Sequence, residues 1–160
     1  MRVEKDFEEF IRLLNKRKVK YLIVGAYAVT FYSQPRNTGD IDFFIQRERG
    51  NVKRLVEVLR DFGFESLNLT EDDFLKPDHT VQLGYEPNRI DILSSISDVE
   101  FAKAYGTKVA ARFGREKAWF ISFKNLLKNK QSIGRKKDEA DVEVLLQFKK
   151  SKRRKKQENF

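Results

Sequence analysis

Residues 21–45 constrain the fold of this chain more than any other stretch: YLIVGAYAVTFYSQPRNTGDIDFFI. The apolar run predicts a buried strand at 20–24, because a short apolar segment bounded by glycine is typical of strands. Gly25 then opens a short helix at 26–33, and a polar loop leads to a second strand at 40–46 that carries two acids. A further helical pattern follows, and this alternation of strand and helix indicates an α/β unit.

The two acids of the second strand, Asp40 and Asp42, stand two residues apart. Side chains at i and i+2 of a strand share one face, so the carboxylates should lie side by side. Carboxylates in such a position repel each other unless a cation or a proton intervenes. Hard divalent cations such as Mg2+ take oxygen ligands, which makes a metal site the functional interpretation. The alternative is that Asp40 closes a turn and Asp42 is a surface acid on an edge strand.

Groups suited to phosphate lie on both sides of the predicted helix. At Gly25 the free backbone N–H groups of the helix N-terminus can face an anion. Arg36 and Thr38 precede the acids and offer hydrogen bonds to phosphate oxygens. A phosphate site beside a metal site suggests a nucleoside triphosphate.

The run GAYAVTFYSQPRNTGDIDFFI resembles the signature of the DNA polymerase beta-like nucleotidyltransferase superfamily: a glycine pair or Gly-Ser, a helix, then an acid-x-acid strand. The most similar branch is the small bacterial nucleotidyltransferases grouped with abortive-infection (AbiEii-type) toxins, which carry an R-x-T-x-D-I-D run. Here that run is formed by Arg36, Thr38, Asp40 and Asp42. Ala26, at a nucleotide-binding position, replaces the usual second glycine or serine.

A third acid stands on a later predicted strand. Residues 79–84 and 88–93 indicate two strands, and alternation in the second places Asp91 among apolar side chains. Burying a carboxylate costs several kcal/mol unless it is paired or bound to metal. The resemblance implies that Asp91 completes the catalytic metal site. The alternative is an ion pair with Arg89 or with Arg36.

A second point of resemblance lies near the C-terminus, where a helix beginning after Ser122 is followed by one at 136–150. The toxin-like branch carries Lys, then Gly-Arg, then Lys-Asp; the matching residues are Lys130, Gly134, Arg135, Lys137, Asp138 and Asp141. The resemblance implies that Lys130 and Arg135 bind phosphates. Alternatively, Asp138 and Asp141 are acids in the first turns of a helix, where the helix dipole favours them.

The remaining pattern completes an α/β (α+β) domain at 1–148: one nucleotidyltransferase domain with a mixed twisted sheet, flanking helices and a C-terminal helical pair. Further elements are predicted as helices at 4–17 and 51–62, a short helix capped by Thr70, a helix at 98–105 capped by Asp98, and a hairpin within 107–121.

Charge is concentrated at the C-terminus of this chain of 160 residues and net charge +9. Residues 149–160 hold seven Lys or Arg and one Glu, a net charge of +6. Like charges in sequence repel and extend, so this tail is expected to be disordered, either as a solubilising end or as an arm for RNA. The chain contains no cysteine, which excludes disulfides and zinc–thiolate sites.

The expected activity is transfer of a nucleoside monophosphate from an NTP, with ATP first, to a hydroxyl of RNA or tRNA, a protein or a small molecule. The resemblance implies Mg2+, as two ions, with Mn2+ as a substitute, and a toxin–antitoxin or phage-defence role with a cognate antitoxin-like partner. The alternative is an inactive module of the same fold that binds RNA or a partner. No apolar run reaches the ~18–20 residues that span a bilayer, and the N-terminus lacks a signal sequence, so the cytoplasm is expected.

Overall fold

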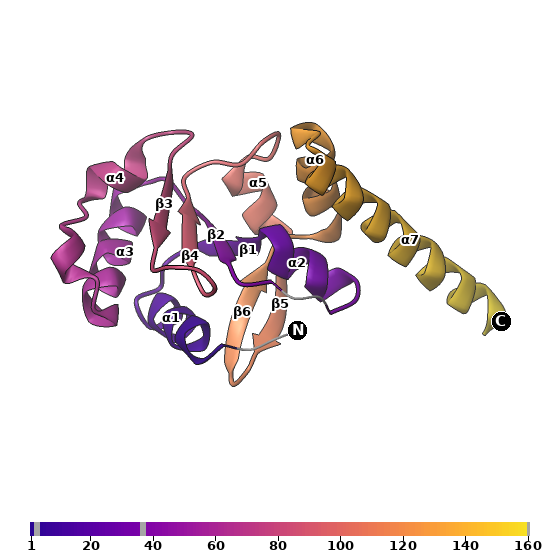
Figure 1. Cartoon of the computed structure of the whole chain (residues 1–160), viewed down its shortest axis with the longest axis horizontal. Coiled ribbons are helices and arrows are strands. Elements are labelled where there is room, and N and C mark those ends of the chain that lie inside the picture. The colour runs from indigo at the N-terminus through magenta and orange to yellow at the C-terminus, as the bar shows by residue number, and fades with distance from the viewer. Residues whose placement is uncertain (2–3, 36–37, 160) are drawn as a thin grey trace.

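A computed structural model describes residues 1, 4–35 and 38–159 (Figure 1). Arg36, one of the predicted phosphate-binding residues, lies outside the described residues. The elements in chain order are α1 (Lys5–Lys16), β1 (Tyr21–Val24), α2 (Gly25–Tyr32), β2 (Ile41–Ile45), α3 (Arg49–Phe62), a 3-10 turn η1 (Glu65–Leu67), α4 (Glu71–Leu75), β3 (Thr80–Leu83), β4 (Ile90–Leu93), α5 (Phe101–Gly106), β5 (Val109–Phe113), β6 (Glu116–Phe120), α6 (Phe123–Ile133) and α7 (Lys136–Glu158).

Within the described residues, six strands form one mixed sheet in the order β3-β4-β2-β1-β6-β5. The β1–β6 and β2–β4 pairs are parallel, and the other neighbouring pairs are antiparallel. β2 therefore lies between two partners, and the alternative that Asp42 is a surface acid on an edge strand is wrong. The expected mixed sheet with flanking helices is confirmed.

Aromatic side chains fill the space on both faces of the sheet. On the face covered by α1 and α3, the Phe10 ring lies 5.3 Å from Phe43 and 5.3 Å from Phe62, measured between centroids. On the other face, Phe101 of α5 packs against Phe44 at 5.1 Å. Since neighbouring strand residues point to opposite faces, Asp42 shares the face of Phe44. The apolar α1–α3 layer and the acidic face are thus on opposite sides of β2.

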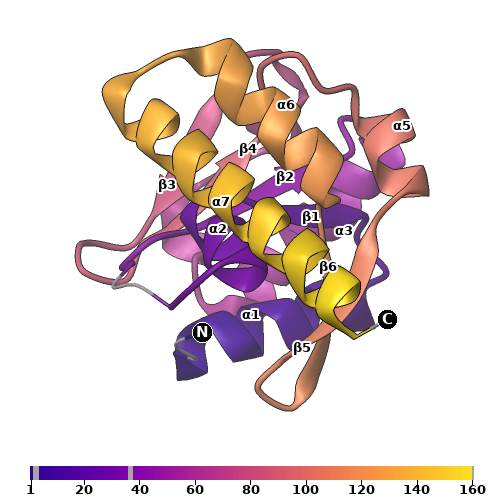
Figure 2. The same cartoon turned by 90° about the vertical axis from the view of Figure 1, so that its right-hand side faces the viewer.

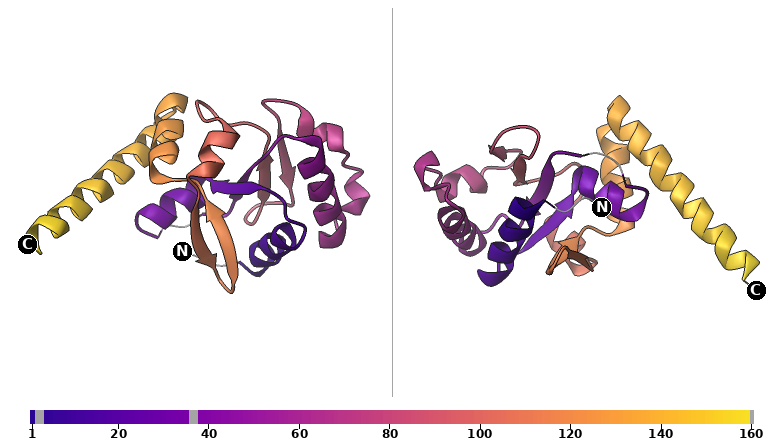
Figure 3. Two further views of the ribbon diagram at one scale, coloured as in Figure 1. Left: turned by 180° about the vertical axis from the view of Figure 1, so that it is seen from behind. Right: turned by 60° about the horizontal axis from the view of Figure 1, so that its bottom comes forward.

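The C-terminal helices begin as the sequence predicts and end later. Ser122 caps α6 by accepting a hydrogen bond from the Asn125 N–H at 3.2 Å. α7 packs against α6 and α2, then projects away from the body of the molecule (Figures 2 and 3).

The prediction that the last helix stops at residue 150 and leads to a disordered tail is wrong, because α7 continues through Glu158. Lys, Arg, Gln and Glu are good helix formers, and the segment lacks Gly and Pro. Extending a formed helix also avoids a new nucleation step. These terms outweigh the repulsion between its charges.

Two predicted caps have different outcomes. Thr70 caps α4 in a capping box with Asp73, whose Oδ2 accepts from the Thr70 N–H at 2.8 Å. Asp98 does not cap α5, which begins at Phe101 with Glu100 at its N-cap. Asp98 instead has a φ of 60°, within a turn closed by the Ile96–Val99 bridge. None of the helices in the described residues has the length and apolar character needed to cross a bilayer.

Candidate active site

The sheet register brings the predicted acids together. Asp42 on β2 lies directly opposite Asp91 on β4 and opposite Val24 on β1. Asp40 comes immediately before β2, where the Ile41 N–H donates to the Arg89 carbonyl at 3.0 Å. Three carboxylates that are far apart in sequence thus converge at one end of two parallel strands.

Gly25 stands against one of these carboxylates. It has a φ of +67°, a conformation that glycine adopts more easily than other residues. A Cβ added there would collide with the Asp42 carboxylate and would lie 2.9 Å from its Cγ. The turn that opens α2 therefore needs glycine for two independent reasons, and it places the start of α2 beside Asp42.

Arg89 is the described cation that contacts these acids. Its Nε donates to Asp91 Oδ1 at 2.7 Å, and one terminal nitrogen lies 3.1 Å from both Asp91 Oδ2 and Asp40 Oδ2. The hydrogen bond from Arg89 to Asp91, followed by the charges of Asp91 and Asp40, raises the pKa of the guanidinium. The ion pair of Asp91 with Arg89, which the sequence offered as one alternative to metal binding, is therefore present. The contact of Arg89 with Asp40 was not predicted, because it depends on the pairing of strands that are far apart in sequence.

Asp42 has an unusual electrostatic environment. Burial, reinforced by the neighbouring charges of Asp91 and Asp40, raises its pKa to about 6, while Lys130 and Lys137 oppose this shift. Among the described residues, three carboxylates face one directly paired cation, Arg89. The cluster therefore carries an excess of negative charge that a further cation would relieve.

The donor atoms fit a hard cation. All three side chains offer oxygen, and in the described part of the chain the buried Asp40 Oδ1 has no hydrogen-bond partner. No group of three or more acidic or histidine side chains in residues 1, 4–35 and 38–159 is arranged closely enough to hold a metal as it stands. Since the Arg89 guanidinium lies between Asp40 and Asp91, metal binding requires that these three side chains rearrange.

The acids open into a cavity of about 840 Å3, a size typical of small-molecule sites. Its walls come from the β1–α2 turn, the loop before β2, the strand β4, and the junction of α6 and α7. The predicted residues that line it are Gly25, Ala26, Thr38, Asp40, Asp42, Asp91, Lys130 and Arg135. Arg89, Asn129 and Lys137 also line the cavity and were not among the predicted site residues.

The loop before β2 is held by a close backbone contact that sequence reasoning missed. A Cβ on Gly39 would collide with the Pro87 carbonyl oxygen and approach the Pro87 carbonyl carbon to 3.0 Å. Thr38 donates from Oγ1 to the Asp40 carbonyl at 3.3 Å. Gly39 thus lets the loop carrying Asp40 approach the loop that leads to Arg89, although a lone glycine in a polar loop gives no signal of this contact.

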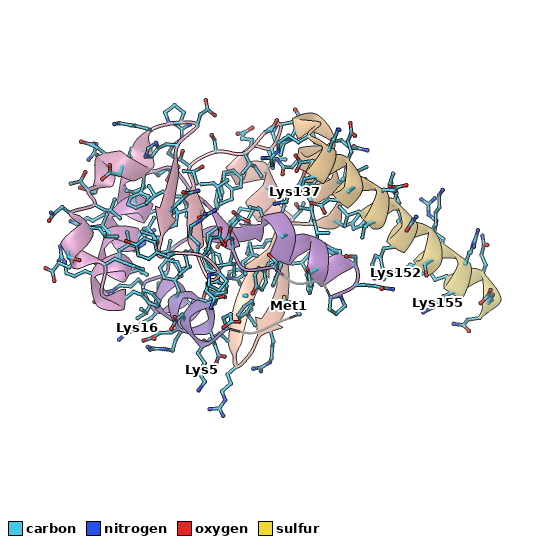
Figure 4. The ribbon with its side chains drawn as sticks, in the orientation of Figure 1. Met1, Lys5, Lys16, Lys137, Lys152 and Lys155 are labelled. Atoms are coloured by element: carbon cyan, nitrogen blue, oxygen red, sulfur yellow. The ribbon has the colours of Figure 1, made fainter. Side chains whose placement is uncertain are left out.

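Lys130 has partners that limit its predicted phosphate-binding role. Only 5% of the residue is exposed, and its ammonium lies 3.2 Å from Asp138 and 3.0 Å from Asp141. The Arg135 Nε is 2.6 Å from Asp138. Burial opposes the charge of Asp138, but the hydrogen bonds from Arg135 and Lys130 outweigh it and lower the pKa of Asp138. As placed, Lys130 ties α6 to α7. Arg135 at the N-cap of α7 and Lys137 in its first turn both line the cavity. Lys137 is labelled in Figure 4.

Comparison with known proteins assigns the fold. The sheet and its flanking helices match the fold of a solved nucleotidyltransferase. Among solved structures the chain is similar to the lincosamide antibiotic adenylyltransferase LnuA, solved with lincomycin bound, at a TM-score of 0.56 and 16% sequence identity. The match covers 91% of this chain and 97% of that one. No protein-family model and no curated protein matches the sequence.

Proposed function

We propose that this protein is a metal-dependent nucleotidyltransferase that moves a nucleoside monophosphate from an NTP to a hydroxyl acceptor. The observation that carries the proposal is the pairing of Asp42 with Asp91 beside the Gly25 turn, in a cavity on a nucleotidyltransferase fold. In the transfer, the acceptor oxygen bonds to the α-phosphorus, the bond from that phosphorus to the β-phosphate oxygen breaks, pyrophosphate leaves, and the hydroxyl proton passes to water.

Each group has a defined part in this proposal. Asp40, Asp42 and Asp91 hold Mg2+, with Mn2+ as a substitute, and Arg89 gives up part of its contact with the acids. The bound metal would supply positive charge to the triphosphate and lower the pKa of the acceptor hydroxyl. The free backbone N–H groups at the start of α2, which Gly25 opens beside Asp42, would face the phosphates.

Two cations at the start of α7 have a second part. Arg135 and Lys137 line the same cavity as the acids and can face phosphate oxygens that extend beyond the metal site. The Arg135 guanidinium also forms an ion pair with Asp138, whereas the charge of Lys137 acts to lower the pKa of Asp42. Thr38 orients the loop that carries Asp40.

The donor and the setting are finer parts of the same proposal. The similarity to an adenylyltransferase favours ATP as the first donor to test. The resemblance to the AbiEii-type branch favours a cytoplasmic toxin–antitoxin or phage-defence role with an antitoxin-like partner. RNA, proteins and small molecules with a hydroxyl group are the candidate acceptors.

A second candidate function is an inactive binding module, and Arg89 is the observation that favours it. A guanidinium bridging Asp40 and Asp91 supplies charge neutralisation without a metal. Such a protein would retain the fold and bind RNA or a partner while leaving NTPs intact.

Labelling distinguishes the two functions. The protein is incubated with each α-labelled NTP, Mg2+ and cell extract, with EDTA as the control, and labelled macromolecules and small molecules are separated. A nucleotidyltransferase gives Mg2+-dependent label on one class of acceptor. Binding of Mg2+ and ATP, measured by calorimetry, accompanies it. Absence of both binding and labelling would overturn the enzymatic proposal in favour of the module.

A further inference from the structure

The C-terminal part of α7 is a strongly basic helix that leaves the body of the molecule (Figures 1 and 3). All residues from 149 to 159 are exposed. The cations are Lys149, Lys150, Lys152, Arg153, Arg154, Lys155 and Lys156. The last buried contact of α7 with the body is made by Leu145, and Phe148 is half-buried.

The charges on α7 differ between its two faces. A helix turns 100° per residue, so Lys152 and Lys155 continue the stripe formed by Leu145 and Phe148. The Lys152 Nζ lies 4.9 Å from the centre of the Phe148 ring, which confirms this side. Figure 4 shows Lys152 and Lys155 on the side of α7 that faces α2. We call this side the inner face.

The inner face also includes Lys137 at the cavity, which lies 18 residues, or about five turns, before Lys155. The acids of this side, Asp138 and Asp141, are buried and paired with Arg135 and Lys130. Within Lys136–Glu158, all of which is described, the exposed acids are Glu139, Glu143 and Glu158. Glu139 and Glu143 project from the opposite, outer face together with Lys150 and Arg154, and Glu158 lies between the two faces beyond Lys155. A polyanion along the inner face from Lys137 to Lys155 thus meets cations and no exposed acid of α7.

The inner face connects the basic segment with the reaction site. Lys137 lines the cavity and its charge acts on Asp42. Fifteen residues of α-helix separate Lys137 from Lys152, a distance of about 22 Å. At about 3.4 Å per stacked nucleotide, this separation corresponds to roughly six nucleotides of a single strand.

We propose that the acceptor is a single-stranded polynucleotide whose backbone lies along the inner face of α7 and whose terminal 3′-hydroxyl enters the cavity. This inference rests on the proposed function and specifies its acceptor class. The phosphates contact Lys152 and Lys155, and the strand continues toward Lys137. Binding depends on length, because a mononucleotide cannot reach from the cavity to Lys152.

Two matched double variants test which face of α7 binds RNA. Lys152→Glu/Lys155→Glu changes the inner face, and Lys150→Glu/Arg154→Glu changes the outer face by the same total charge. Binding of a fluorescent 12-nucleotide single-stranded RNA is measured by anisotropy at several salt concentrations, with circular dichroism to verify helix content. The inner variant should bind at least about tenfold more weakly at low salt and lower the slope of log affinity against log salt by about 1.4, as expected for two lost phosphate contacts.

The outer variant should retain most of the affinity and slope. Equal losses in both variants would show an effect of net charge alone and overturn the proposal, as would unchanged binding in both. The proposal would also be overturned if the inner variant lost binding to vesicles of anionic phospholipid while its RNA binding stayed unchanged. That result would indicate that the inner face binds membranes.

Mg2+–ATP binding tests the proposed enzymatic function independently of the RNA-binding surface. Mg2+–ATP binding should be the same in wild type and both double variants, because the substituted residues lie outside the cavity. If ATP is never bound while the inner variant alone loses RNA, the enzymatic proposal fails and the binding surface stands. A DNA strand of the same sequence then shows whether binding requires the ribose 2′-hydroxyl. An RNA blocked at its 3′ end shows whether label transfer requires the terminal 3′-hydroxyl.

Discussion

Two charged clusters in this molecule use the same residue types and differ in charge balance. At the sheet, Arg89 bridges Asp40 and Asp91, and Asp42 adds a third carboxylate without a directly paired cation among the described residues. At the α6–α7 junction, Lys130 bridges Asp138 and Asp141, and Arg135 adds a second cation. Counted over the described residues, the first cluster has more carboxylates than cations, and the second has two of each.

The difference separates a binding site from a structural ion-pair network. Buried charges are tolerated when they are paired, and removing one partner leaves the other unpaired at high cost. A cluster of unbalanced charges facing a cavity is instead typical of a functional site. Sequence motifs named residues in both clusters, so the balance of charge is what distinguishes their roles.

The same substitution in each cluster should have opposite consequences, and it gives the largest expected effects. Asp42→Asn removes a charge that its neighbours repel, so nucleotide transfer should fall by orders of magnitude while the free energy of unfolding stays equal or rises by up to about 2 kcal/mol. Asp138→Asn leaves two cations facing one aspartate, so the free energy of unfolding should fall by about 3 kcal/mol.

Urea unfolding and label transfer per folded molecule measure the two effects. A stable Asp42→Asn variant with full activity would remove Asp42 from the site. An Asp138→Asn variant of wild-type stability would show that the α6–α7 cluster does not hold these helices together.

Removal of the bridging cation tests whether the sheet cluster accepts a metal. Arg89→Gln leaves Asp40 and Asp91 unneutralised, so the variant should melt lower than wild type in EDTA. Mg2+ should then raise its melting temperature by several degrees more than it raises that of wild type, because binding to the folded state stabilises it. Differential scanning fluorimetry with and without Mg2+ measures the shift.

Arg17→Gln is the matched control for that experiment. Arg17 also bridges two carboxylates, with its nitrogens 3.0 Å from Glu57 and 2.8 Å from Asp61, but it does not line the cavity. Its variant should show the same Mg2+ shift as wild type. Equal shifts in the Arg89→Gln and Arg17→Gln variants would contradict metal binding at the sheet cluster.

Acid should weaken the α6–α7 cluster through Asp138. Its pKa is lowered in the folded protein, so near and below pH 4 the unfolded chain binds more protons than the folded chain. The stabilisation is therefore complete above the unfolded pKa and is lost as pH falls through the folded pKa. The difference in unfolding free energy between wild type and Asp138→Asn should be largest at pH 7 and smaller at pH 3. A difference independent of pH would exclude Asp138 as the titrating group.

The smallest expected effect is at Ala26, which lines the cavity in the first turn of α2. Ala26→Gly should cost about 0.5–1 kcal/mol of stability, because glycine is less favourable in a helix. Mg2+–ATP affinity, measured by calorimetry, should change little if the methyl group leaves room for the phosphates. A large gain of affinity or transfer in the glycine variant would show that Ala26 restricts the site.

The local patterns were predictable from the sequence because strands and helices impose short periods. The Gly25 turn, the place of Asp42 on its strand, the Thr70 and Ser122 caps and the hairpin before α6 all follow from neighbouring residues, whereas Asp40 was predicted on that strand and lies just before it. Asp91 was also found, since an acid within an apolar alternating strand needs a partner.

The features that sequence reasoning missed depend on contacts between distant segments or on competing local terms. The bridge from Arg89 to Asp40 needs the β2–β4 register, and the Gly39–Pro87 contact needs two loops to meet. The role of Lys130 stayed open because a phosphate and a pair of aspartates both favour a lysine. The end of α7 was placed too early because charge repulsion was given more weight than helix propensity.

The close approach of Gly25 to Asp42 has a consequence for conformational entropy. The Asp42 carboxylate is confined on one side by the Gly25 backbone, which restricts the rotamers open to it. The freedom that a carboxylate normally loses on binding a cation is therefore largely lost already when the chain folds. Preorganisation of this kind strengthens binding without any additional contact. Asp42, whose charged form is disfavoured by burial and by the neighbouring acids, therefore loses little further conformational entropy when it binds a cation.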